Sequence, residues 1–375
     1  MLFSYKYVPH QMEKMQTFID FIFYEVWCNA ACNGRFNLDL FERNQPLKEV
    51  MTAFFYDDTK GGDFFYGYVE RIYGLFAKLT ADQIDQFKLW YKGNNDIEKV
   101  CANDPALLIV KYAEITFIHK ELSEQLSIFF KGLYSKQLLD LAALRQKIGD
   151  IDDHYQTFMQ QNTSGKCPFC GVGDLKGVYH SKRDAYDHIL PKGLYPFNSI
   201  NLRNLAPACH ECNSTYKLTK DPLNSLTGRR KAFYPYATNG YNIEIKIKID
   251  KSHIYDLSPS DIELEFGPVA FNEEIETWKD VYGIEERYKA KCCSENDGKY
   301  WLMQVMDEWQ VNDRSPVEYL NILNRQTKRS PFAESNFLRK AFLEGCDRAG
   351  MFSIKKDALE TKNQKPKCTA KKFLT

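Results

Sequence analysis

Hydrophobic residues in the first 160 positions recur every three or four residues, which is the spacing of helices that bury one face. The first stripe runs from Met12 to Val26. Thr80 and Gln83 stand three apart, as in a capping box, and the apolar face that follows them ends at Gly93. The pattern therefore predicts a helical N-terminal region.

Two longer helices are expected in the second half of this region. Asp104 and Pro105 are an N-cap and a proline at the first helical position, and apolar residues then continue at helical spacing to Phe129. A further helix is expected over residues 138–159. The polar stretch 161–166 follows, and we interpret it as a domain boundary.

The hydrophobic period changes to two after residue 240. Isoleucines alternate with charged residues over 243–250, and the alternation returns over 261–267, so both segments are predicted to be half-buried strands. Asn239 and Gly240 are a tight-turn pair, which favours a hairpin of the first strand with residues 232–238. From Asn272 the helical spacing returns. Ser315-Pro316 and Ser330-Pro331 each read as a helix start.

These patterns predict an α+β protein that is mainly helical, with a small antiparallel β element packed on a central core. The expected divisions are a helical N-terminal domain (1–160), a central core (167–231), the β element (232–270), C-terminal helices (271–354) and a basic mobile tail (355–375). The helical N-terminal domain is expected to serve interaction or regulation, because it has no cluster of carboxylates or histidines at ligand spacing.

The composition narrows the class of protein. Of 375 residues, 44% are hydrophobic and 27% are charged, which is ordinary for a folded soluble chain. No run of about 18 uncharged apolar residues is present, so no membrane span is expected. The N-terminus lacks the pattern of a secretory signal, and the expected location is the cytoplasm.

The net charge of zero conceals a basic region. Residues 176–231 hold ten lysines or arginines against four acids, a local net charge of +6. Such a region favours a phosphate-binding surface, and a solvated face with acidic neighbours in space is the alternative. The candidate contacts with nucleic acid are Lys192, Lys217, Arg229 and Arg230.

Four of the eleven cysteines form two CxxC pairs, Cys167/Cys170 and Cys209/Cys212. Paired spacing in a reducing compartment is typical of a tetrahedral four-thiolate zinc site rather than of disulfides. Since four protein ligands leave no open position, this zinc is expected to be structural. The 38 residues between the pairs must form a further fold.

Those residues spell DAYDHILPK, then NL, then CHECNSTYK, and this order resembles the HNH endonuclease family. The family's ββα-metal core is often held by two such cysteine pairs. The resemblance covers Cys167 to about Pro222 and is greatest to HNH proteins of bacterial anti-phage systems, including the Septu-type nuclease subunit. It implies a metal-dependent endonuclease that cuts DNA, the effector of a defence system.

By this resemblance, His188 is the general base, while Asp187 and Asn213 hold one Mg²⁺ or Mn²⁺ ion. Asn204 would brace the loop that aims His188. Asp187 and the Asn213 amide offer the oxygen ligands that hard divalent ions prefer. A histidine that is neutral near pH 7 can accept a proton from water.

A second class of function stays open at this stage. The same cysteine pairs and enclosed residues could belong to a zinc-stabilised nucleic-acid-binding or adaptor subunit that does not cleave nucleic acid. A partner ATPase that binds the helical N-terminal domain is also compatible with the resemblance.

Overall fold

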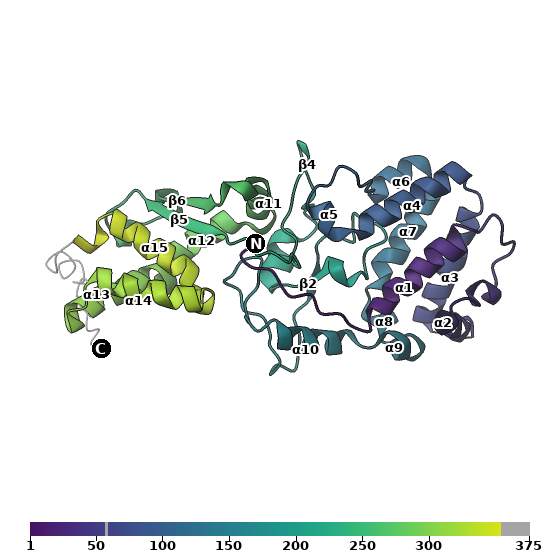
Figure 1. Ribbon diagram of the computed structural model, residues 1–375, viewed down its shortest axis with the longest axis horizontal. Helices are drawn as coiled ribbons and strands as arrows, with labels where there is room; N and C mark the ends of the chain where they lie inside the picture. Colours follow the sequence, from purple (N-terminus) through teal and green to yellow (C-terminus); the bar gives the residue numbers. More distant parts are fainter. Residues whose placement is uncertain (57–58, 354–375) are drawn as a thin grey trace, which may run out of the picture. The chain divides into compact units, whose positions relative to one another are not determined.

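The computed structural model describes residues 1–56 and 59–353. These residues are mainly helical and contain small paired strands, as the α+β prediction requires. The predicted basic tail, 355–375, lies outside them. The chain forms two compact units (Figure 1). The first unit comprises Met1–Ile243 and Gly267–Ile284, and the second comprises Glu244–Phe266 and the chain from Glu285 onward.

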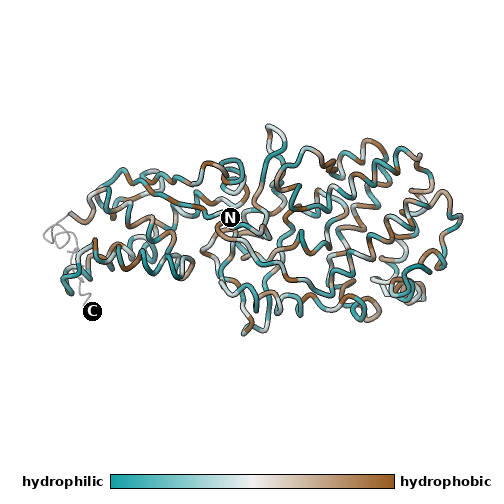
Figure 2. The backbone as a smooth tube through the Cα atoms, viewed as in Figure 1, coloured by the Kyte–Doolittle hydropathy of each residue, from teal (hydrophilic) through white to brown (hydrophobic). Residues whose placement is uncertain are grey.

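Within the described residues, the first unit opens with a series of α-helices, one π-helical segment (η1) and one 3-10 helix (η2). They are α1 (Glu13–Phe21), η1 (Ile22–Trp27), η2 (Leu38–Phe41), α2 (Gln45–Phe55), α3 (Lys60–Phe76), α4 (Ala81–Asn95), α5 (Ile97–Cys101), α6 (Tyr112–Ile118), α7 (Lys120–Leu133), α8 (Lys136–Leu139), α9 (Ala142–Ile148) and α10 (Ile151–Gln161). Hydrophobic and hydrophilic positions alternate along these helices in Figure 2, as amphipathic packing requires.

The predicted helices at the start of the chain are confirmed. The stripe from Met12 to Val26 forms α1 and the π-helical η1, with its apolar side chains in the core. The capping box of Thr80 and Gln83 begins α4. This helix ends at Asn95 rather than at Gly93. Glycine at position 93 instead lets the helix lie close to the backbone at Leu108, since a Cβ there would stand 2.0 Å from the Leu108 carbonyl oxygen.

The predicted long helix from Asp104 to Phe129 is wrong. The chain is not helical from 106 to 111, because the side chain of Asn94 pairs with both backbone groups of Val110, at 2.9 and 3.0 Å. Helix α6 begins only at Tyr112 and ends at Ile118. The next residue, His119, caps the start of α7 with its imidazole. A local proline signal is thus overridden by a tertiary contact.

The helix predicted over 138–159 is three helices instead of one. The chain breaks after α8, and again at Gly149, which takes a φ of +77° that helical residues do not adopt. The polar stretch 161–166 does not separate two compact units either. Tyr112 N donates to Leu194 O at 3.0 Å, so the helices and the cysteine region share one unit.

The rest of the first unit contains the cysteine region. Its elements are β1 (Tyr186–His188), η3 (Leu202–Asn204), β2 (Leu205–Pro207), η4 (Glu211–Lys217), β3 (Asn224–Ser225), β4 (Gly228–Arg229), η7 (Val269–Phe271) and α11 (Asn272–Tyr282). Strand β1 pairs antiparallel with β2, and β3 pairs antiparallel with β4. The π-helical segment η4 follows β2 and packs against α11.

The second unit combines one strand pair with helices. Its elements are β5 (Glu244–Ile249), η5 (Ile254–Asp256), η6 (Pro259–Asp261), β6 (Ile262–Gly267), α12 (Ile284–Cys293), η8 (Glu295–Lys299), α13 (Tyr300–Asn312), α14 (Pro316–Arg329), η9 (Ala333–Ser335), α15 (Asn336–Arg348) and η10 (Met351–Ser353). Strand β5 and helix α15 lie in close contact at Gly345. A Cβ at Gly345 would stand only 2.7 Å from the carbonyl oxygen of Ile247 on β5.

Both predicted strands in this region are present, but their pairing differs from the prediction. Strand β5 pairs with β6, not with residues 232–238. The pair packs against α15, which covers the apolar face of β5, and it belongs to the second unit, whereas the cysteines belong to the first. The helix start at Ser315-Pro316 is confirmed with a capping box. The start at Ser330-Pro331 is wrong, since α15 begins at Asn336.

Candidate functional site

The four paired cysteines come together in the first unit. Their sulfur atoms all lie within 4.8 Å of one another, and all four side chains are buried. Cys170 Sγ and Cys209 Sγ are 3.8 Å apart, far beyond a disulfide bond of about 2.05 Å. Four sulfurs about 2.3 Å from one tetrahedral zinc would be about 3.8 Å apart. Residues 1–56 and 59–353 contain no other cluster of this kind.

The backbone around the cysteines is shaped to keep the sulfurs together. Gly173 N donates to Cys170 Sγ at 3.3 Å, and a Cβ at Gly173 would stand 2.6 Å from Cys209 Sγ. Glycine is therefore required there. Burial raises the pKa of Cys167 and of Cys212 well above the usual thiol range. Deprotonated sulfurs in this setting need a bound cation, so the cluster is compatible with structural zinc.

Helix α11 fastens the first cysteine pair, a role that sequence reasoning missed. The indole of Trp278 donates to Phe169 O, and the rings of Phe169 and Tyr282 stack with centroids 4.9 Å apart. The sequence assigned this helix to the C-terminal region by position alone. The apolar stripe of α11, which includes Trp278, indicates that one face of the helix is buried. Nothing in the neighbouring sequence indicates which segment that face contacts.

Strand β1 presents Asp187 and His188 on opposite faces of the β1–β2 pair. Asp187 lies opposite Ala206, and His188 lies opposite Leu205. The Asp187 carboxylate is buried and has two partners. Lys217 Nζ lies 2.6 Å from its Oδ1, and the Tyr282 hydroxyl donates to its Oδ2 at 3.3 Å.

The imidazole of His188 is half-buried and oriented by the backbone. Its Nε2 lies 2.9 Å from the Ser199 carbonyl oxygen, and its ring meets that of Tyr134 edge to face at 4.8 Å. Because a carbonyl can only accept, Nε2 must hold the proton, which leaves the Nδ1 lone pair of the neutral ring available. Burial, aided by the charges of Lys192 and Lys217, lowers the pKa of His188 to about 3.

Asn204 holds the segment that follows His188. Its Oδ1 accepts from Leu190 N at 2.8 Å, and its Nδ2 donates to Leu190 O at 3.2 Å and to Asn198 O at 3.1 Å. Its own carbonyl accepts from Ile189 N at 2.9 Å. The side chain is wholly buried, so these bonds meet no competition from water.

The predicted divalent-ion site does not fit this arrangement. Both oxygens of Asp187 are engaged, and its charge is already balanced by Lys217. Asn213 lies on η4 at an intermediate depth, and within the described residues no hydrogen bond joins its side chain to Asp187. Placing Mg²⁺ or Mn²⁺ on Asp187 would first require breaking a buried ion pair, at a cost of several kcal/mol.

Three of the four predicted nucleic-acid contacts are occupied within the protein. Lys217 is buried with Asp187. Lys192 Nζ lies 3.3 Å from Lys131 O and over the Tyr134 ring. Arg230 pairs with Asp280 at 2.7 Å. Arg229 is exposed, with one long hydrogen bond of 3.4 Å to Leu107 O.

Comparisons with known proteins give two partial similarities. The chain is 28% identical to the Septu protein PtuB of Bacillus thuringiensis over 102 residues, which are 25% of this chain and 38% of that protein. It is 32% identical to protein ea31 of Escherichia phage lambda over 83 residues, 22% of this chain and 24% of that protein. The match thus spans well under half of either relative. No family model and no solved structure matches.

No helix in the described part of the chain combines the length and the apolar character that crossing a bilayer requires.

Proposed function

We propose that the chain is an endonuclease of the HNH type that hydrolyses phosphodiester bonds of DNA, with His188 as the general base. The single observation that carries this proposal is the bond between His188 Nε2 and the Ser199 carbonyl. It fixes the tautomer so that Nδ1 can take a proton from water. In this scheme water gives a proton to His188 Nδ1 as it attacks the phosphorus. The bond from phosphorus to the leaving O3′ breaks, and that oxygen takes up a proton from solvent to become a 3′-hydroxyl.

The surroundings of His188 support the proposal. Asn204 fixes the backbone at Ile189 and Leu190, so it acts as a positioning residue for the imidazole. An antiparallel strand pair followed by the helical segment η4 is the element order that the HNH resemblance implies. The four cysteines would hold one structural zinc that fastens η4 to the preceding loop.

No step is assigned to a divalent ion at Asp187, because that carboxylate is engaged with Lys217 and Tyr282. We assign Asp187 a positioning role instead. Its ion pair ties strand β1 to the end of η4, and Lys217 also donates to the backbone carbonyl of His188. The pair therefore restrains the residue that carries the proposed base.

The partial similarity to a Septu protein suggests a role in anti-phage defence and a partner in a defence complex. We propose that an ATPase partner binds through the helical N-terminal region. Phe55 and Tyr56 at the end of α2 support this, because 51% and 77% of their surfaces are exposed. Phe54 and Phe65 are buried and belong to the core.

The test is incubation of the purified protein with supercoiled plasmid and single-stranded DNA, in Mg²⁺, Mn²⁺ or EDTA. Cleavage by the wild type that is lost in His188→Ala and kept in His180→Ala would support the proposal; His180 is exposed and serves as the matched control. Tight DNA binding without cleavage under every condition would favour the adaptor function instead.

A further inference from the structure

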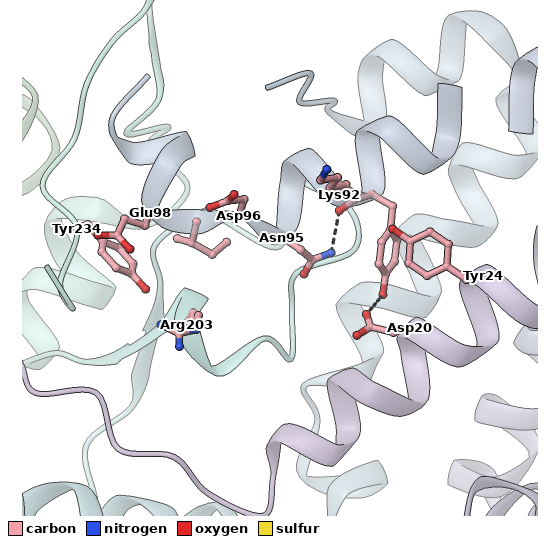
Figure 3. Close-up of a pocket in the computed structure, with 10 residues that line it drawn as sticks. Asp20, Tyr24, Lys92, Asn95, Asp96, Glu98, Arg203 and Tyr234 are labelled. Atoms are coloured by element: carbon pink, nitrogen blue, oxygen red, sulfur yellow. Dashed lines mark hydrogen bonds between the residues drawn. The ribbon is translucent and has the colours of Figure 1, made fainter. Parts of the chain in front are cut away.

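A polar cavity of about 580 Å³ lies in the first unit (Figure 3). Its walls come from α1 and η1, from the end of α4, from α5, from η3 and from the chain at Tyr234. This volume is within the range of small-molecule sites, roughly 300–1,000 Å³. The predicted nuclease residues do not line it, and its position beside η3 places it next to Asn204.

Several polar groups of the wall are not fully paired within the protein. The Tyr234 side chain is only 3% exposed, and its hydroxyl lies beside the Arg203 guanidinium with no other partner at ordinary hydrogen-bond distance. The guanidinium of Arg203 lies 4.3 Å from the Tyr7 ring centre, and the described residues give it no carboxylate partner. Lys92 and Glu98 are exposed, form no ion pair within the described residues, and line the cavity. A buried hydroxyl whose hydrogen bonds are incomplete costs free energy unless a ligand supplies the missing hydrogen bond.

The chemical groups that line the cavity differ between its two ends. Figure 3 shows Arg203, Tyr234 and Glu98 at one end, and Tyr24 with Asp20 at the other. An arginine and a buried hydroxyl suit a phosphate group. A carboxylate such as Glu98 suits the paired hydroxyls of a ribose. A half-exposed tyrosine ring suits a stacked base, and Asp20 can accept from a base N–H.

We propose that this cavity binds a free ribonucleoside monophosphate. Its phosphate lies at Arg203 and Tyr234, its ribose hydroxyls face Glu98, and its base stacks on Tyr24. The inference does not depend on the proposed nuclease activity, because binding is a separate property of separate residues.

The cavity is linked to the segment of His188 by a network of asparagines. Asn95 at the end of α4 accepts from the Asn201 amide at 3.0 Å, and Asn201 caps η3, which holds Arg203 and Asn204. Asn204 in turn bonds to Leu190. A second bond, from Asn198 Nδ2 to Asn94 O at 3.0 Å, runs parallel to this chain. Ligand binding is therefore expected to stabilise the backbone at residues 189 and 190.

The experiment measures thermal unfolding of the full chain with adenosine and guanosine monophosphate, their 2′-deoxy forms and inorganic phosphate. A ribonucleotide at ten times its Kd should raise Tm by about 2–4 °C. The deoxy forms should bind at least about fivefold more weakly, because they lose one hydrogen bond to Glu98. Arg203→Met should weaken binding by about tenfold or more. Arg35→Met, at an exposed arginine outside the cavity, should bind as the wild type does.

A second variant keeps the test decisive if Arg203→Met is poorly folded. Glu98 is exposed, so Glu98→Gln should fold normally and bind ribo and deoxy forms more equally. Hydrogen exchange of the amides of Ile189 and Leu190 should slow when the nucleotide binds. Unmoved Tm at millimolar nucleotide, an equal shift with inorganic phosphate alone, or unchanged ribose preference in Glu98→Gln would overturn the assignment. Normal binding without any change in exchange would overturn the link to His188.

Discussion

The ammonium group of Lys217 lies 2.6 Å from the carboxylate of Asp187, and the two side chains are only 1% and 3% exposed. The same ammonium donates to the carbonyl of His188, and Tyr282 donates to the second carboxylate oxygen. Burying two charged groups is tolerated only when the groups form an ion pair and their other donors and acceptors are also hydrogen-bonded. All three contacts here satisfy that condition.

Removing one partner of this pair should destabilise the first unit strongly. We expect Lys217→Met to lower the free energy of unfolding by about 3–5 kcal/mol, because Asp187 would be left charged and buried. The measurement is urea unfolding with zinc present. Lys220→Met, at an exposed lysine of the same segment, should stay close to the wild type. The double variant Asp187→Leu, Lys217→Met should recover much of the loss. If the double variant is no more stable than Lys217→Met, the pair does not have this role.

Binding of Mn²⁺ separates the positioning role of Asp187 from that of a metal ligand. In the arrangement described, the wild type should bind no Mn²⁺ through Asp187, so Asp187→Asn should leave a calorimetric Mn²⁺ titration of the zinc-loaded protein unchanged. A single Mn²⁺ bound by the wild type and lost in Asp187→Asn would contradict this. In that event Lys217→Met should bind the ion more tightly, since the competing ammonium is gone.

Cleavage should depend on His188 through its Nδ1. We expect His188→Ala to reduce cleavage by at least ~10²-fold, the low end for a positioned general base, while zinc content and DNA binding remain. The rate of plasmid nicking under single-turnover conditions is the readout. Added Mg²⁺ or Mn²⁺ should not rescue this variant, because metal cannot replace a missing base. Undiminished cutting would remove His188 from the mechanism.

The cysteine cluster should hold one zinc per chain. Elemental analysis should return one equivalent for the wild type and for Cys32→Ser, an exposed cysteine outside the cluster. Cys209→Ser should lose zinc and expose at least residues 167–222 to proteolysis, because metal binding supplies folding free energy in such regions. A Cys209→Ser protein with normal zinc content and stability would show that the cluster is only a group of buried thiols.

His154 should make stability depend on pH below neutrality. Burial lowers its pKa to about 4 from 6.5, with the nearby His10 acting in the same direction, and its Nδ1 lies 2.6 Å from the Tyr186 hydroxyl. The unfolded chain therefore takes up a proton between pH 6.5 and 4 that the folded chain resists. Stability is full above pH 6.5 and falls as the pH drops toward 4, by about 3 kcal/mol from this group.

The comparison with His154→Gln isolates this contribution, because His188 and His10 also have lowered pKa values. The slope of unfolding free energy against pH over this window should be smaller in the variant. Equal slopes would mean that folding does not lower the pKa of His154.

Short-range signals predicted the parts of this protein that depend on neighbours in sequence. The capping box at Thr80 and the cysteine pairs each lie within four residues of their partners, and both are present. The sequence could not predict that Asn94 would hold Val110 extended, or that Tyr282 would reach Asp187 across 95 positions. Lys217 illustrates the same limit. The sequence predicted that Lys217 is a nucleic-acid contact, with a solvated cation as the alternative, and only the packing of η4 and α11 reveals that it is buried.

The contact of Trp278 with Phe169 also sets a condition on biosynthesis. The ribosome delivers the four cysteines by residue 212, but the indole that closes over the first pair emerges more than sixty residues later. Strands β5 and β6, which belong to the other unit, are made in between. A nascent chain thus exposes an uncovered set of thiols for several seconds at about 5–20 residues per second. During that interval the cysteines are open to zinc, and equally to oxidants or the wrong metal.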